Sequence, residues 1–270
     1  MTLHPIFAGP RLTAIGSGKG GTGKTMIAVQ LAQSLAVMGE RVLLCDADFG
    51  LPNTALQLDL DHGGDFGGVM SGSRTVGETV VPVYGGAKLR GGFDLLAPPS
   101  GSGAFADAGG KVASRLIAAL RSARNYDRVL IDLSAGVDST VMGLAAASDE
   151  TILVLTPDPS SLADAYAFAK FLLRASPSRP PEFVVNLAAS EAEARRAADA
   201  FAATCRAFLK VVPKMLGIVP RDSRVVEAMR RQESVQKLFP GSPATRALGA
   251  IAKGLCLRPE PCLLALSGLR

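Results

Sequence analysis

The segment GKGGTGKT at residues 18–25 has the residue types and spacing that most clearly indicate chemistry. Gly18, Gly23, Lys24 and Thr25 complete the pattern GxxxxGK(S/T). In such a loop the glycines let backbone N–H groups face phosphate oxygens, the lysine neutralises terminal phosphate charge, and the hydroxyl ligates magnesium. The pattern predicts a P-loop that binds a nucleoside triphosphate with Mg²⁺.

A second glycine pattern overlaps the first. Residues 16–21, GSGKGG, satisfy the GxGxxG fingerprint of dinucleotide-binding proteins, and Asp46 ends the second predicted strand about where a ribose-binding acid would lie. A hydride-transfer site, however, needs neither Lys24 nor Thr25. The longer pattern therefore favours a triphosphate site over a nicotinamide site.

Two acidic segments follow predicted strands. Asp48 lies in DADFGLPN at 46–53, and Asp132 lies in VLIDLSAG at 129–136. Carboxyl ends of parallel strands meet at one edge of a sheet, so both carboxylates are expected to face Lys24. Carboxylates at that edge can act on a bound nucleotide or its metal ion.

The hydrophobic pattern predicts the strands and helices that must position these residues. Strands are predicted at residues 12–16, 41–46, 93–98, 128–133, 151–157, 182–186 and 215–220. Helices are predicted over 24–38, 110–124 and 160–174, from helical spacing and capping residues. This alternation predicts an α/β fold with a doubly wound, mostly parallel sheet flanked by helices.

The length and the pattern predict one domain over residues 1–270, with 257–270 as a C-terminal tail. Residues 61–92 and 98–110 are rich in Gly and Ser and lack strong periodicity, so they are expected to be surface loops. The tail has a leucine-rich patch that is broken by prolines. A weak membrane contact and a packed or frayed tail both remain open.

Composition narrows the classes of partner and compartment. The net charge of +5 permits an acidic partner, but the arginines are spread along helices beside Glu and Asp, which favours a solvated surface over a nucleic-acid partner. The four cysteines show no CxxC spacing and no neighbouring histidines, which fits a reducing cytosol. We expect a cytoplasmic protein, with a peripheral position at the inner face of the cell membrane left open.

Lys19 places a second positive charge inside a loop whose backbone donors already point inward. KGGTGKT at 19–25 resembles the deviant Walker A motif of the MinD and ParA family of P-loop ATPases. The resemblance implies that ATP binding drives dimerisation and that hydrolysis reverses it. It also implies that Lys19 reaches the phosphates bound by the opposite subunit, as an arginine finger does.

The same resemblance assigns roles to individual residues. Asp48 would orient the attacking water near magnesium, and Asp132 would hold the magnesium hydration shell. The implied catalytic residues are Lys19, Lys24 and Asp48, and the implied metal-site residues are Thr25, Asp48 and Asp132. The implied nucleotide-binding residues are Gly18, Lys19, Gly20, Gly21, Thr22, Gly23, Lys24, Thr25, Met26, Asp158, Asn186, Pro220 and Asp222.

Longer stretches resemble the FlhG family, also called FleN, whose members are MinD-like ATPases that control flagellar number and placement. These stretches are DADFGLPN, IDLSAGVDSTV at 131–141, TPDPSSLADAYAFAKFL at 156–172, FLKVVPKMLGIVPRDSRVVEAM at 208–229 and FPGSPATRAL at 239–248. The resemblance implies an ATP-dependent homodimer with flagellar partners: an FlhF-like GTPase, a flagellar transcription activator or C-ring proteins. Asp158 stands where the family usually has a glutamate that reaches across the dimer towards the signature lysine.

Two alternatives stay open. One is a MinD or ParA role in septum placement or DNA partition, which predicts a functional membrane tail or a dimer-dependent basic DNA face. That face would be formed by Arg221, Arg224, Arg230, Arg231 and Lys237. The other is a binding module that uses ATP only as structural glue. Normal ATP turnover would exclude the second alternative, and salt-sensitive DNA retention would favour the DNA version of the first.

Overall fold

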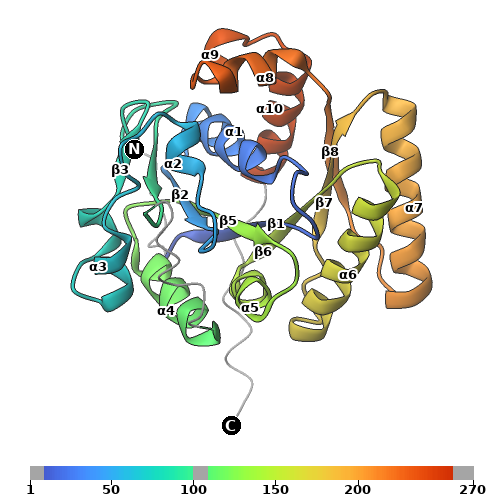
Figure 1. Ribbon diagram of the computed structural model, residues 1–270, viewed down its shortest axis with the longest axis horizontal. Helices are drawn as coiled ribbons and strands as arrows, with labels where there is room; N and C mark the ends of the chain where they lie inside the picture. Colours follow the sequence, from blue (N-terminus) through green and yellow to red (C-terminus); the bar gives the residue numbers. More distant parts are fainter. Residues whose placement is uncertain (1–8, 100–108, 258–270) are drawn as a thin grey trace.

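The computed structural model describes residues 9–99 and 109–257, in which eight strands form one sheet with helices on both faces (Figure 1). The strand order is β3-β4-β2-β5-β1-β6-β7-β8, and every neighbouring pair is parallel except β3 and β4. The strands are β1 (Arg11–Ser17), β2 (Val42–Ala47), β3 (Val81–Val83), β4 (Phe93–Leu96), β5 (Arg128–Ala135), β6 (Glu150–Leu155), β7 (Glu182–Ala188) and β8 (Met215–Pro220). The predicted doubly wound, mostly parallel sheet is confirmed.

The helices alternate with the strands along most of the chain. They are α1 (Lys24–Val37), α2 (Thr54–Gln57), α3 (Phe66–Ser71), α4 (Gly109–Ser122), α5 (Ser139–Ala147), α6 (Pro159–Ala175), α7 (Glu191–Leu209), α8 (Ser223–Arg230), α9 (Val235–Leu238) and α10 (Pro243–Cys256). A short 3-10 helix spans Val76–Glu78. Within the described ranges, no helix combines the length and the apolar character needed to cross a bilayer.

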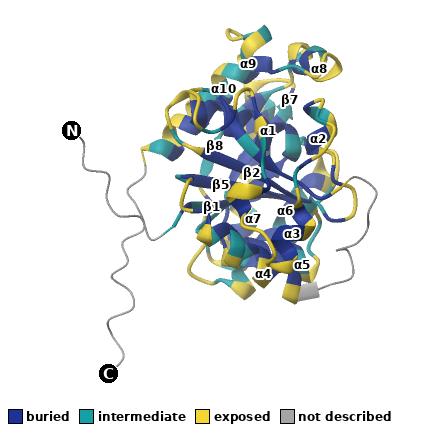
Figure 2. Cartoon of the chain, turned by 90° about the vertical axis from the view of Figure 1, so that its left-hand side faces the viewer, coloured by how far each residue is buried: buried dark blue, intermediate teal, exposed yellow. Residues whose placement is uncertain are grey.

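The sheet is buried on both faces because successive side chains of a strand point to opposite sides. In β2, for example, Leu43 and Cys45 join the apolar cluster beneath α3 to α7, whereas Leu44 joins the cluster beneath α1 and α10. Figure 2 shows dark, buried strands between helices whose outer faces are exposed. Near-continuous Val, Ile and Leu runs in the strands are therefore what this architecture requires.

The strand order sets the place of the functional loops. β1 lies inside the sheet, with β5, β2 and β4 following on one side and β6, β7 and β8 on the other. The loops after β1, β2, β5, β6 and β7 all leave the sheet at its carboxyl edge. A crevice at this edge, where the order reverses, is where open α/β sheets bind ligands.

Structure and sequence prediction differ most between residues 61 and 92. These residues were expected to be surface loops, which is wrong in part, because they contain α3, the 3-10 helix and β3. α3 is only 6 residues long, includes two glycines and begins at Asp65, whose carboxylate accepts from the Gly68 N–H. β3 is a 3-residue edge strand that contains Pro82. Elements this short carry no readable periodicity.

Two other predicted segments lie partly outside the described residues. Of the predicted loop 98–110, residues 100–108 are not described, and Gly109 already belongs to α4. The predicted tail begins at Leu257, the last described residue, so its remaining residues, including Cys262, lie outside the described part.

Candidate nucleotide site

The P-loop joins β1 to α1, and its glycines are required by contacts as well as by backbone angles. Gly23 has φ +82°, in the left-handed region, and a Cβ there would lie 2.4 Å from Nδ2 of Asn186. A Cβ on Gly18 would lie 2.2 Å from the backbone oxygen of Asp164, at the start of α6. Larger residues at these two positions would push the loop away from its neighbours.

The outer turn of the loop is open enough for a phosphate group. A Cβ on Gly20 or Gly21 would meet nothing within 4 Å, and Gly21 has φ +78°. Glycine-rich turns with left-handed residues expose consecutive N–H groups on a concave surface that fits an anion. The hydroxyl oxygen of Thr22 is buried and has no hydrogen-bond partner in the structure. The residues of the loop therefore fit the phosphates of a nucleotide.

Lys24 is buried together with two carboxylates. Its Nζ lies 2.9 Å from Oδ1 of Asp132, and Asp132 pairs in register with Asp46 of the neighbouring strand. Burial raises the pKa of Asp132 to about 6, against the opposing effect of Lys24. Burial also raises the pKa of Asp46. The predicted convergence of Lys24 and Asp132 is thus present, and a hydrogen bond from Thr25 reaches the same carboxylate.

Asp46, which the sequence analysis considered only as a ribose-binding acid, has a structural role at the site. Its carboxylate accepts from the backbone N–H groups of Asp48 at 2.9 Å, Asn53 at 3.2 Å and Thr54 at 3.1 Å. It therefore fixes both ends of the loop at residues 48–53 and the first turn of α2. The repeated acid in DADFG is the signal that could have indicated it, because the first aspartate ends a buried strand.

We expect Asp46→Ala to loosen this loop, because three N–H groups lose their acceptor. Amide hydrogen exchange at Asp48, Asn53 and Thr54 should accelerate, and the free energy of unfolding should fall by about 1–3 kcal/mol. Exchange measured by NMR with thermal unfolding tests both effects. Unchanged exchange at these three amides would show that Asp46 does not hold the loop.

Asp48 lies at the start of the loop that Asp46 fixes. It is half-buried, and its Oδ1 accepts from the N–H groups of Gly50 at 3.2 Å and Leu51 at 3.1 Å. The carboxylate thus closes a turn in its own loop, whereas Lys24 bonds to Asp132. Asp48 directly follows β2 and so lies at the carboxyl edge of the sheet, whereas its orientation towards Lys24 stays a prediction.

Lys19 lies at the rim of the site with about a third of its side chain exposed. Its Nζ lies 2.7 Å from the hydroxyl of Ser160 and 3.3 Å from Oδ1 of Asp158, in the same chain. Asp158 also accepts from the N–H of Ser161 and so caps α6. Hydrogen bonds from Thr156 and Ser160 lower the pKa of Asp158. The ammonium of Lys19 is therefore held at the surface, against an ionised carboxylate.

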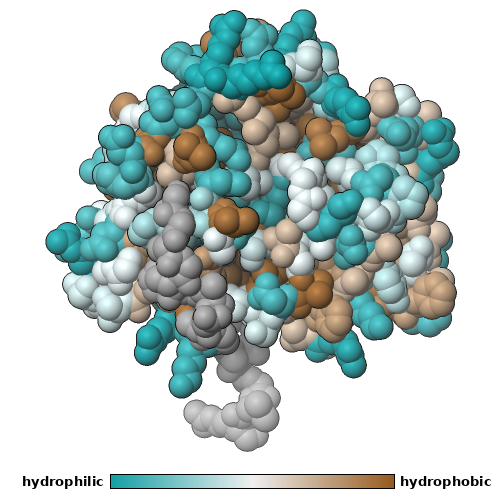
Figure 3. All heavy atoms as spheres, viewed as in Figure 1, coloured by the Kyte–Doolittle hydropathy of each residue, from teal (hydrophilic) through white to brown (hydrophobic). Residues whose placement is uncertain are grey.

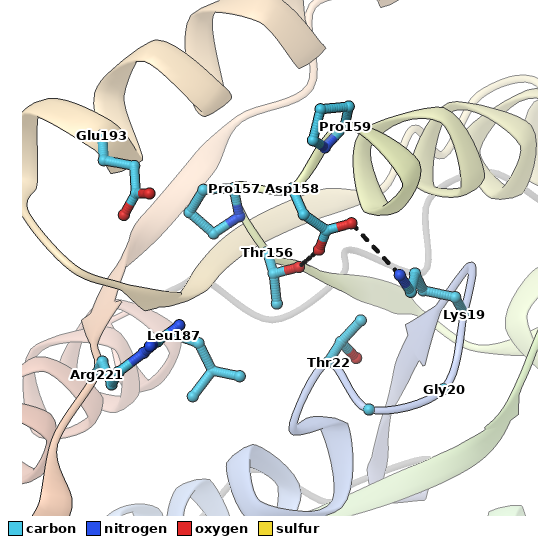
Figure 4. Close-up of a pocket in the computed structure, with 11 residues that line it drawn as sticks. Lys19, Gly20, Thr22, Thr156, Pro157, Asp158, Pro159, Leu187, Glu193 and Arg221 are labelled. Carbon is cyan, nitrogen blue, oxygen red and sulfur yellow. Dashed lines mark hydrogen bonds and ion pairs between the residues drawn. The ribbon is translucent and has the colours of Figure 1, made fainter.

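A pocket of about 470 Å³ opens between the outer half of the P-loop and the loops that follow β6, β7 and β8 (Figure 4). Leu187 lines it in a left-handed conformation, with φ +59°, an unusual backbone for a leucine. Glu193, which the sequence reasoning did not assign to the site, and Arg221, which lies between the predicted nucleotide-binding residues Pro220 and Asp222, face it from the far side. The lining residues are Lys19, Gly20, Gly21, Thr22, Thr156, Pro157, Asp158, Pro159, Leu187, Glu193 and Arg221.

The remaining predicted residues are mainly engaged in holding the site together. Asn186 is fully buried and donates from Nδ2 to the carbonyl of Thr22 at 2.7 Å, while its Oδ1 has no hydrogen-bond partner. Asp222 caps α8 and also accepts from the N–H of Ala244 in α10. Pro220 ends β8, and Met26 is buried in the first turn of α1. The hydrogen bond from Asn186 thus joins the P-loop to β7.

The sequence matches one large family. Residues 13–235 match the family described as "CobQ/CobB/MinD/ParA nucleotide binding domain". This match covers the P-loop, both acidic segments and the pocket loops.

Individual relatives have flagellar and cell-division names. The chain is 30% identical to "Antiactivator FleN" of Pseudomonas aeruginosa over 96% of this chain and 90% of FleN. It is 28% identical to "Flagellum site-determining protein YlxH" of Helicobacter pylori, over 90% of this chain and 80% of that protein. Its fold superimposes with a TM-score of 0.72 on a chain of the MinC:MinD cell division protein complex of Aquifex aeolicus, at 26% identity, covering 93% of this chain and 98% of that one.

Proposed function

The chain is a MinD-like P-loop ATPase of the CobQ/CobB/MinD/ParA family, within its FlhG/FleN branch, and from this premise we propose that ATP switches it between monomer and dimer to regulate flagella. The observation that carries the proposal is the division of labour between two lysines of one loop. Lys24 is buried against Asp132, whereas Lys19 lies at the surface, 3.3 Å from Asp158. A charge at the surface of the site is placed to act on a nucleotide outside its own loop.

The buried residues suit the phosphates and magnesium of ATP. Lys24 would neutralise terminal phosphate charge, and the Thr25 hydroxyl would ligate Mg²⁺, which supplies charge neutralisation during phosphoryl transfer. Asp132 would hold the metal's hydration shell once Lys24 turns to the phosphates. Asp48 lies on a separate, anchored loop, and the resemblance to the MinD and ParA family gives it the role of orienting the attacking water.

The Lys19→Ala variant should still bind ATP but fail to dimerise with it. The lost contact is a charge-assisted hydrogen bond to a phosphate of the opposite subunit, worth about 10- to 150-fold in the dimer dissociation constant. Sedimentation velocity with a slowly hydrolysed ATP analogue measures this constant.

Ser160→Ala is the matched control, because it removes the 2.7 Å contact to Lys19 but keeps the lysine. It should dimerise with the analogue. If Lys19→Ala instead dimerises as the unmodified chain does, Lys19 acts only within its own subunit.

The flagellar part of the proposal is supported by the names of FleN and YlxH. We propose a cytoplasmic protein whose two forms present different surfaces to a flagellar transcription activator, an FlhF-like GTPase or C-ring proteins. Counting and locating flagella in a deletion strain tests this role. Normal flagella together with misplaced septa would instead assign the chain to cell division.

The DNA-partition alternative has one feature in its favour, a group of exposed arginines. Arg221, Arg224 and Arg230 are exposed at α8. Nearby positive charges are already neutralised, since Arg231 pairs with Glu227 and Lys237 with Glu233. We therefore do not expect nucleic acid as a partner, and salt-independent passage of the ATP-bound chain through a DNA column would agree.

A further inference from the structure

Residues 231–238, which we call the strap, run from the end of α8 through α9 and lie across α1 (Figure 1). The top of the molecule, formed by α8 and α9, is mainly hydrophilic on the face shown in Figure 3. Beneath this surface Val235 is buried with the apolar residues of α1 and α10. The strap is thus polar outside and packed inside.

Three uncharged polar residues of α1 are buried, which is unusual for a helix against an apolar core. They are Gln30, Gln33 and Ser34. The strap supplies hydrogen-bond partners to this part of α1: the hydroxyl of Ser234 donates to the Gln33 side chain, and Nε2 of Gln236 donates to the backbone carbonyl of Gln30 at 3.1 Å and to the Ser34 hydroxyl. Buried polar groups that are hydrogen-bonded in this way favour a single packing arrangement of the two segments. The strap is therefore fixed to the helix that begins at Lys24.

Gln232, near the start of the strap, has an unfavourable backbone conformation. Its φ is +51°, and the next residue, Glu233, donates its N–H back to the Ala228 carbonyl, which closes α8. Glycine is the usual residue at such a helix end, because a side chain strains the left-handed backbone. A glutamine at this position indicates that its side chain makes a contact that glycine could not make.

That side chain contacts α2, the short helix that follows the loop carrying Asp48. Nε2 of Gln232 donates to the carbonyl of Leu56 in α2 at 3.1 Å. α2 follows the Asp48 loop directly, and Asp46 holds its first N–H. The loop is thus held at both ends by Asp46, and the helix that follows it, α2, is tied to the strap by Gln232.

We propose that Gln232 is a positioning residue for ATP hydrolysis, which ties α2 to the strap and so holds the Asp48 loop in place. The inference rests on the proposed ATPase mechanism, in which Asp48 orients water. Without the tie, the loop would sample positions in which Asp48 is misplaced, while Lys24 and the P-loop remain as they are. The kcat should therefore fall while the KM for ATP stays unchanged.

The Gln232→Gly variant tests this, because it removes the side chain and also relieves the backbone strain. Its thermal stability should be equal or higher. The kcat should fall about two- to tenfold, the range expected for one hydrogen bond. Amide exchange in residues 48–58 should accelerate.

Lys210→Gly is the matched control, because Lys210 ends α7 with φ +60°. It relieves the same kind of strain without touching α2, and it should change neither kcat nor exchange in residues 48–58. Unchanged kcat and exchange in Gln232→Gly would overturn the proposal. Equal changes in both variants would overturn it too. If the unmodified chain hydrolyses no ATP, the proposed function fails instead, and the exchange measurement alone still decides whether Gln232 holds the loop.

Discussion

ATP binding is expected to be lost in the Lys24→Ala variant, with affinity falling by about 100-fold or more. The physical reason is that Lys24 carries the one positive side chain buried between Asp132 and Asp46 in the described structure. Truncating one member of such a buried pair typically costs about 3–5 kcal/mol, because the other charge is left unpaired. Phosphates entering the P-loop would then meet two uncompensated carboxylates. Isothermal titration with Mg-ATP measures the loss.

The same substitution also threatens the fold, so a second variant separates the two effects. Combining Lys24→Ala with Asp132→Asn removes both members of the 2.9 Å ion pair. Stability should largely return, since no carboxylate at position 132 is left unpaired, but ATP affinity should not. An ATP affinity equal to that of the unmodified chain in either variant would end the P-loop assignment.

Turnover is expected to fall about 10²- to 10⁴-fold in Asp48→Ala, which is the usual cost of removing a group that orients the attacking water. ATP affinity and dimerisation should persist, because Lys24, Thr25 and Asp132 are untouched. The loop itself should survive, since Asp46 holds its ends. The variant should therefore accumulate as an ATP-bound dimer. Parallel measurements of ATP affinity, dimer fraction and phosphate release test these three expectations.

Asp48→Asn is the control that separates charge from loop geometry. Its amide oxygen can still accept from Gly50 and Leu51, as Oδ1 of Asp48 does. Turnover should fall as in the alanine variant. If Asp48 instead helps to ligate magnesium, ATP affinity and dimerisation will be lost together, and raised magnesium will partly restore both. Turnover at the level of the unmodified chain in both variants would remove Asp48 from the mechanism.

The central sheet could be predicted because its strands are buried on both faces. All seven predicted strands occur, with ends shifted by at most two residues, and α1, α4 and α6 match the predicted helices closely. One edge strand, β8, was predicted, but the opposite edge strand, β3, could not be. β3 has three residues and pairs only with β4, so its formation depends on a neighbour rather than on its own pattern.

Residues of the candidate site also differ in whether the sequence could predict them. The P-loop could be recognised because eight consecutive residues carry its chemistry, and Asp132 because it ends a buried strand. The roles of Asp46 and Gln232 depend on hydrogen bonds to residues elsewhere in the fold, which no local pattern encodes. Within one chain Lys19 contacts Asp158, and the reach of Lys19 to the phosphates of the opposite subunit stays a prediction.

The central claim is that ATP, and not ADP, makes this chain a dimer. Sedimentation velocity of the unmodified chain with Mg²⁺ and a slowly hydrolysed ATP analogue, with Mg-ADP, and without nucleotide tests it most directly. The proposed mechanism predicts a dimer with the analogue and a monomer of 27.9 kDa in the other two samples. A monomer in all three samples, or the same dimer in all three, would contradict it.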